Sequence, residues 1–173
     1  YVVVALYNLN EVPQTVDLRL DQLGFGSEEP CLVYEFWNER YVGTRRTRVC
    51  VHVPGESVQV LRIVAASNGP TLLGTDMHVL MGEMDVEDFA YDPVSMLCTV
   101  TATRPPGNRG MVFIHAPETL RVEPDGLHVA RDGHDNALII GVPLDFRDTN
   151  RVTRQIQFAA VDAPLDMNQQ DLA

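Results

Sequence analysis

The sequence contains no lysine, and all thirteen of its basic residues are arginine. This absence excludes a Schiff-base lysine and the lysine of a phosphate-binding loop. We attribute the exclusive use of arginine to genome composition. The formal net charge is −11. Such a charge argues against binding to nucleic acid or to an anionic membrane surface, since both require clustered positive charge.

Long hydrophobic runs and paired cysteine motifs are also missing. No apolar run approaches the roughly 20 residues that cross a bilayer. The three cysteines, Cys31, Cys50 and Cys98, show no C-x-x-C spacing. This pattern favours buried, reduced thiols. A Cys31–Cys50 disulfide is the alternative if the protein is exported.

Motifs for catalysis and metal binding are absent as well. The sequence has no G-x-S-x-G, phosphate loop, dinucleotide fingerprint or zinc pattern. We therefore assign no catalytic, cofactor-binding or metal-binding residue. His78 has no neighbour at ligand spacing, and a buried histidine bonded to the backbone is favoured there, as for His115 and His128. Asp132 and Asp135 lack the spacing of a calcium loop and favour a turn.

What the sequence does contain is a series of short strand-like segments. The chain has 173 residues, of which 45% are hydrophobic, enough for one ordinary domain or two small ones. Five strands are predicted in the first block, at residues 1–9, 15–20, 31–37, 47–53 and 57–65. In the last of these the apolar phase switches between Val60 and Leu61, which predicts a β-bulge. Because the sequence begins within a strand and without methionine, we expect a piece of a longer protein.

Seven further strands are predicted in a second block, at residues 83–91, 96–103, 111–115, 119–123, 127–130, 137–142 and 151–161. An acidic first turn of a helix is the alternative at residues 83–91. Pro124-Asp125-Gly126 predicts a hairpin that pairs residues 120–122 with residues 127–129. We thus predict an all-β chain of two antiparallel β-sandwich domains in tandem, of Greek-key or jelly-roll type. The boundaries are residues 1–66 and 67–161, followed by a flexible polar tail at 162–173.

The first block resembles the C-terminal β-domain of glycoside hydrolases of the α-galactosidase (melibiase) type. The elements that carry the resemblance are, in order, Asn8, Leu23-Gly24, Glu35-Phe36-Trp37, Gly43, His52 and Leu61-Arg62. Glu35-Phe36 departs from the usual aspartate before the tryptophan, and Val-Pro-Gly after His52 also differs. The stretch Leu72-Leu73-Gly74-Thr75, with His78 and Gly82 after it, is similar to the segment that follows this domain in the same family.

The resemblance implies a non-catalytic accessory region of a melibiase-like enzyme. In that family two aspartates on a (β/α)₈ barrel perform the chemistry, and an all-β chain of this length cannot contain such a barrel. The expected partner is therefore the catalytic barrel of the same polypeptide, which this region would pack on and stabilise. No catalytic residue carries over to this chain.

Two other functions remain open. An independent carbohydrate-binding module would stack sugars on exposed aromatic rings, and the candidates are Trp37, Tyr34, Tyr41 and Tyr91. For Trp37, the apolar flanking residues favour a place in the core instead. An enzyme in its own right would use His78 or His52 with a carboxylate.

Overall fold

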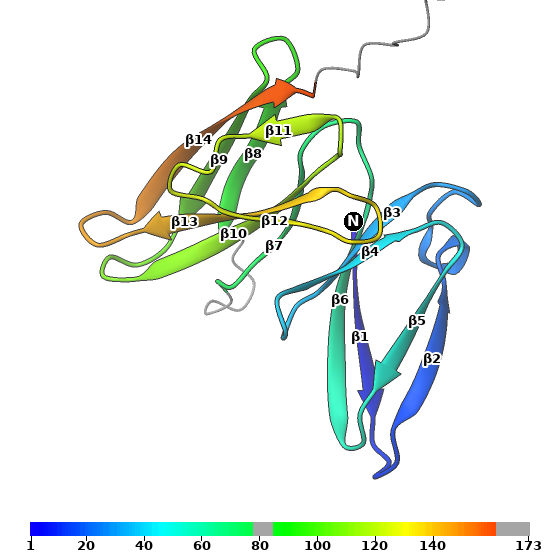
Figure 1. The fold of residues 1–173 in the computed structure, drawn as a ribbon. Coiled ribbons are helices and arrows are strands. Elements are labelled where there is room, and N and C mark those ends of the chain that lie inside the picture. Colours follow the sequence, from blue (N-terminus) through cyan, green and yellow to red (C-terminus); the bar gives the residue numbers. More distant parts are fainter. Residues whose placement is uncertain (78–84, 162–173) are drawn as a thin grey trace, which may run out of the picture.

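The computed structural model describes residues 1–77 and 85–161 and is all-β. All strand pairs are antiparallel, and the one helical element in these two ranges is the 3-10 turn Asp21–Leu23. Two units are visible in Figure 1, one coloured from blue to cyan and the other from green to orange. The predicted pair of antiparallel sandwiches is thereby confirmed. His78 and residues 162–173 lie outside the described residues.

The first unit packs a four-stranded sheet, in the order β1-β6-β3-β4, on the two-stranded sheet β2-β5. Its strands are β1 (Val2–Asn8), β2 (Gln14–Arg19), β3 (Cys31–Glu35), β4 (Arg40–Arg45), β5 (Arg48–Val53) and β6 (Ser57–Ala65). Strand β4 was not predicted. Alternating residues fill the core, as the pattern of β5 illustrates: Val49, Val51 and Val53 are buried while Arg48, Cys50 and His52 are exposed.

Strand β6 does not contain the predicted bulge. Its register with β1 runs without a break from Val2↔Ile63 to Asn8↔Ser57, and its register with β3 is equally regular. The apolar phase appears to switch in sequence because both faces of β6 are apolar. Leu61 and Ile63 face the core, whereas Val58 and Val60 face the opposite side of the sheet.

The second unit packs the sheet β12-β13-β10-β7 on the sheet β11-β14-β9-β8. Its strands are β7 (Thr71–Thr75), β8 (Val86–Asp92), β9 (Leu97–Thr103), β10 (Arg109–Ala116), β11 (Leu120–Val122), β12 (His128–Arg131), β13 (Leu138–Asp145) and β14 (Arg151–Ala160). No strand of one unit pairs with a strand of the other, so residues 66–70 separate the two sets of sheets. Strands β8 and β9 pair as a hairpin, with Asp92 accepting hydrogen bonds from the Val94 backbone and the Ser95 hydroxyl in its turn.

The hairpin predicted around Pro124-Asp125-Gly126 is wrong. The chain does turn there, with Gly126 at φ 63° and a hydrogen bond from the Leu127 N–H to the Pro124 carbonyl. However, β11 pairs with β14 and β12 pairs with β13. The turn therefore carries the chain from one sheet of the sandwich to the other, because turn residues specify a reversal and not a pairing partner.

The cysteines are all unpaired, which excludes the Cys31–Cys50 disulfide in this structure. Cys31 and Cys98 are buried as predicted, and burial raises the pKa of Cys98 to about 12. Cys50 is exposed, contrary to the prediction of a buried thiol. It lies on β5 with its side chain on the outward face, where the Asp17 carboxylate is its neighbour.

Candidate functional site

No metal-binding cluster is found in the part of the chain that the structure describes. Residues 1–77 and 85–161 contain no group of three or more His, Cys, Asp or Glu side chains that could hold a metal ion. Within the same ranges no helix is long and apolar enough to cross a membrane.

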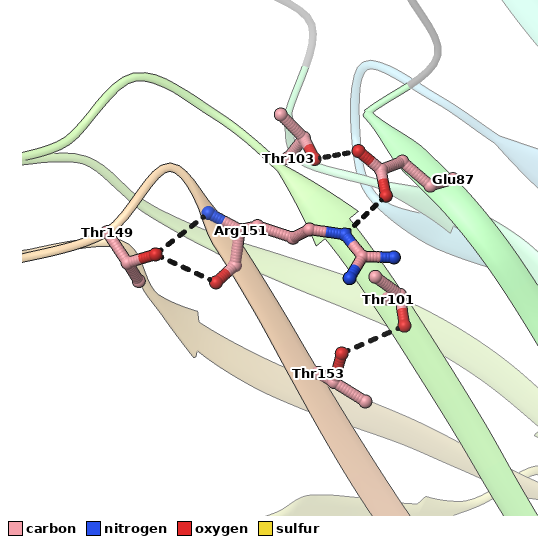
Figure 2. Close-up of polar contacts among 6 residues, drawn as sticks. All are labelled: Glu87, Thr101, Thr103, Thr149, Arg151 and Thr153. Atoms are coloured by element: carbon pink, nitrogen blue, oxygen red, sulfur yellow. Dashed lines mark hydrogen bonds and ion pairs between the residues drawn. The ribbon is translucent and has the colours of Figure 1, made fainter.

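The outward face of the sheet β8-β9-β14 carries two separate groups of polar contacts (Figure 2). Glu87 accepts a hydrogen bond from the Thr103 hydroxyl and pairs with Arg151 at 2.7 Å. Thr101 and Thr153 share a hydrogen bond of 2.9 Å. The bond from Thr103, followed by that from Arg151, lowers the pKa of Glu87. These side chains satisfy one another, as expected of a solvated sheet face.

The four aromatic candidates do not form a common sugar-binding face. Tyr34 is only 1% exposed and stacks on Phe113. Tyr41 is half-buried beside His115, and Tyr91 packs edge-on against Phe158 at 6.2 Å between ring centroids. Only Trp37 presents a large exposed area.

The core position predicted for Trp37 is wrong, since this residue is 55% exposed. Strand β3 ends at Glu35, whose buried carboxylate accepts hydrogen bonds from the backbone N–H groups of Trp37 and Asn38. That bond pattern turns the chain before Trp37 can continue the strand. Its ring then lies in an edge-to-face contact with Phe36, at 5.1 Å between centroids.

Of the three histidines predicted to be buried, His115 and His128 lie within the described residues, and they behave differently. His115 is buried as predicted, with 5% of its surface exposed, and its Nδ1 atom has no hydrogen-bond partner. Burial lowers the pKa of His115. His128 is exposed on β12, contrary to prediction, and His52 is exposed on β5.

The two units meet in a seam that is apolar at its centre and polar at one end. Tyr34 of β3 stacks on Phe113 of β10 with ring centroids 5.6 Å apart, and Tyr41 of β4 lies 5.5 Å from His115. The seam comprises Leu32, Tyr34, Tyr41, Thr44, Val64, Leu73, Phe113, His115, Asp135 and Ile139. These residues come from β3, β4 and β6 on one side and from β7, β10, β13 and the β12–β13 turn on the other.

Asp135 is the polar anchor of the seam. Its Oδ2 atom accepts hydrogen bonds from the Tyr41 and Thr44 hydroxyls, each 2.7 Å long. Burial raises the pKa of Asp135, but these two bonds and one from the Ala137 N–H outweigh that effect and bring the pKa to about 2. The turn predicted from Asp132 and Asp135 is confirmed, since Asp132 accepts hydrogen bonds from the backbone N–H groups of His134 and Asp135.

Among residues 1–77 and 85–161 a large apolar surface is left uncovered, and we call it the β1–β6 face. It consists of Tyr1, Val3, Ala5, Tyr7, Val58, Val60 and Arg62. Directly opposed residues of antiparallel strands point to the same side, and the pairs are Val3↔Arg62, Ala5↔Val60 and Tyr7↔Val58. Tyr1, Val3 and Tyr7 are 69%, 58% and 72% exposed.

The β1–β6 face is continuous with the seam. Tyr34 lies opposite Arg62 across β3 and β6, and Leu32 lies opposite Val64, so the same side of one sheet carries both surfaces. At the seam the second unit covers this side, but over β1 it stays open. A groove of about 370 Å³ lies at the far end of β1, lined by Tyr7, Asn8, Leu9, Glu56, Ser57 and Val58.

The sequence carried a signal for this face that its analysis missed. β1 is an edge strand, and solvated edge strands alternate apolar and polar residues. The run from Val2 to Tyr7 contains no polar residue. An unbroken apolar run is typical of a strand that is covered on both sides.

Comparison with known proteins adds no family assignment. No protein-family model matches this chain, and no curated protein matches it either.

Proposed function

We propose that this chain is a non-catalytic accessory β-region of a melibiase-like glycoside hydrolase. Its β1–β6 face packs on the catalytic (β/α)₈ barrel of the same polypeptide and stabilises it. The observation that carries the proposal is the uncovered apolar side of β1, where three large side chains are each more than half exposed. Contiguous apolar surface of this kind marks an interaction site.

The composition of the β1–β6 face supports a protein partner. Tyrosine and arginine are enriched at protein interfaces, and the face combines Tyr1, Tyr7 and Arg62 with small valines on a regular sheet. Full burial of a valine-sized or larger side chain contributes about 1.5–3 kcal/mol. The exposed members thus supply several kilocalories per mole of docking energy.

Continuity with the seam supports the same proposal. The second unit already uses one end of this side of the sheet as an interface, through Leu32 and Tyr34. A further domain on the open end would extend that interface over β1. Such a partner would also cover β1 at the sheet edge, where unpaired backbone groups are otherwise available to other chains.

The proposal predicts opposite results for the complete polypeptide and for this chain alone. When the complete polypeptide carries the double substitution Val3→Thr and Tyr7→Thr, we expect it to lose catalytic activity on heating at least tenfold faster than the unmodified polypeptide does. The free energy of unfolding of the isolated chain is expected to change by less than about 0.5 kcal/mol, because both positions are exposed there. Threonine is β-branched and has a high strand propensity, so both substitutions are compatible with the strand.

Val94→Thr is the matched control, since Val94 is 92% exposed in the β8–β9 turn, away from the face. Equal inactivation rates for the double variant and the control would contradict docking through β1. Hydrolysis of 4-nitrophenyl α-galactoside by the isolated chain would contradict the non-catalytic assignment.

An independent carbohydrate-binding module is the second candidate, and the exposed ring of Trp37 favours it. Trp37 is the single tryptophan of the chain, so tryptophan fluorescence reports on this ring alone. If Trp37 stacks on a sugar, melibiose produces a saturable change in its emission and protects it from acrylamide quenching. We expect acrylamide to quench the emission and melibiose to leave it unchanged; a saturable response would favour the second candidate.

A further inference from the structure

Arg62 is the one charged residue of the β1–β6 face, and it lies at the centre of the sheet. On β6 it is opposed by Val3 of β1 on one side and by Tyr34 of β3 on the other. Its guanidinium carbon lies 4.3 Å from the centroid of the Tyr1 ring, which covers one face of the cation. The neighbours along β6 on the same side are Val60 and Val64.

This arginine lacks an acidic partner within the described residues. Its Nε atom is buried and has no hydrogen-bond partner. The five ion pairs found in residues 1–77 and 85–161 use other arginines, although the chain has an excess of acidic residues. Burial lowers the pKa of Arg62, which reflects the unfavourable removal of its charge from water.

An unsatisfied donor occupies the neighbouring position as well. The Tyr34 hydroxyl is buried without a hydrogen-bond partner, and Tyr34 is the residue directly opposite Arg62. A buried donor left without an acceptor costs about 1–3 kcal/mol, and more if it is charged. The sheet thus brings two donors that lack an acceptor to adjacent positions, where the open face meets the seam.

We propose that Arg62 binds a carboxylate of the domain that docks on the β1–β6 face. The identity of that domain rests on the function proposed above. Arginine presents a planar fork of N–H donors that matches the two oxygens of a carboxylate. A single negative charge would neutralise the single positive charge of the face, so that an otherwise apolar contact could close without leaving a charge unpaired. The partner surface is thus an apolar patch that contains one aspartate or glutamate.

The test compares Arg62→Lys and Arg62→Met in the complete polypeptide, measured as the rate of loss of catalytic activity on heating. Lysine keeps the charge but not the fork, whereas methionine keeps the apolar stem and removes the charge. We expect the rate to increase in the order Arg62, Arg62→Lys, Arg62→Met, with at least a tenfold rise for methionine. The isolated Arg62→Met chain is expected to be as stable as the unmodified chain or more so, because the substitution removes an unpaired charge.

The order of the two variants separates charge pairing from packing. If Arg62 acts by packing alone, methionine performs at least as well as lysine, and that result would overturn the proposal. The double variant Val3→Thr and Tyr7→Thr tests docking through the β1–β6 face independently of the proposed contact between Arg62 and a carboxylate, which we call the carboxylate anchor. Rapid inactivation of that variant together with an unchanged Arg62→Met would refute the carboxylate anchor and keep the docking face. Unchanged rates in both would refute both.

Discussion

Replacing Tyr34 with alanine is expected to lower the free energy of unfolding by about 3–5 kcal/mol, the range for losing a buried aromatic side chain. Tyr34 is 1% exposed and belongs to the cluster with Leu32 and Leu73 that joins the two units. Close packing around the ring leaves little room for relaxation. A Cβ atom on Gly74 would lie 2.8 Å from Tyr34 Cε1, so the backbone of β7 approaches the ring directly.

The companion variant Tyr34→Phe is expected to be as stable as the unmodified chain or more stable, by up to about 1 kcal/mol. The reason is that the buried Tyr34 hydroxyl has no partner to lose. Urea denaturation of both variants gives the two free energies. A loss of more than 1 kcal/mol in Tyr34→Phe would mean that the hydroxyl is bonded in solution, and it would remove one of the two unsatisfied donors beside the β1–β6 face.

Replacing Asp135 with asparagine is expected to destabilise the chain by about 2 kcal/mol at pH 7, because hydrogen bonds to a charged acceptor contribute about 1.5–3 kcal/mol. Asp135 accepts hydrogen bonds from the hydroxyls of Tyr41 and Thr44, and both of these residues belong to the other unit. Loss of the carboxylate therefore weakens the seam at its polar end.

The same variant has a defined pH dependence. The pKa of Asp135 is about 2 in the folded chain, against an ordinary value of 3.8. A depressed pKa contributes stability that is fully present above about pH 5 and is lost as the pH falls through the unfolded value towards 2. After allowance for partial exposure this contribution is about 1–2 kcal/mol. The difference in free energy of unfolding between the unmodified chain and Asp135→Asn is thus expected to decrease as the pH is lowered from 5 to 2.

Urea denaturation at a series of pH values measures that difference. The control is Asp125→Asn, an exposed aspartate in the turn between β11 and β12. We expect the control to follow the unmodified chain at every pH. If the difference in free energy of unfolding between the unmodified chain and Asp135→Asn stays constant from pH 7 to pH 2, the ionised carboxylate does not stabilise the seam.

Period-two patterns predicted the strands whose two faces differ in polarity. Strand β5 is the clearest case, since its valines are buried and the residues between them are exposed. The pattern failed for β6, where Val58 and Val60 lie on the opposite face from Leu61 and Ile63. A strand that is apolar on both faces cannot be distinguished from a bulged strand by its periodicity alone.

Pairing partners and surface positions were harder to predict than strands. The turn at residues 124–126 was recognised, but the sequence holds no local information on whether its two strands share a sheet. The exposure of Trp37 depends on the hydrogen bonds that Glu35 accepts from the following backbone, and the apolar run around Trp37 gives no local sign of these bonds. The apolar run of residues 2–7 indicates a strand covered on both sides, but only the register places Val3 and Tyr7 beside Arg62 and Val58 on one face.

Covalent footprinting with hydroxyl radicals tests the central claim most directly. The side chain of Tyr7 is compared between the isolated chain and the complete native polypeptide, with Val94 as an exposed reference in both. We predict that Tyr7 is labelled readily in the isolated chain and is strongly protected in the complete polypeptide, while labelling of Val94 stays the same. Equal labelling of Tyr7 in the two forms would contradict a domain docked on the β1–β6 face.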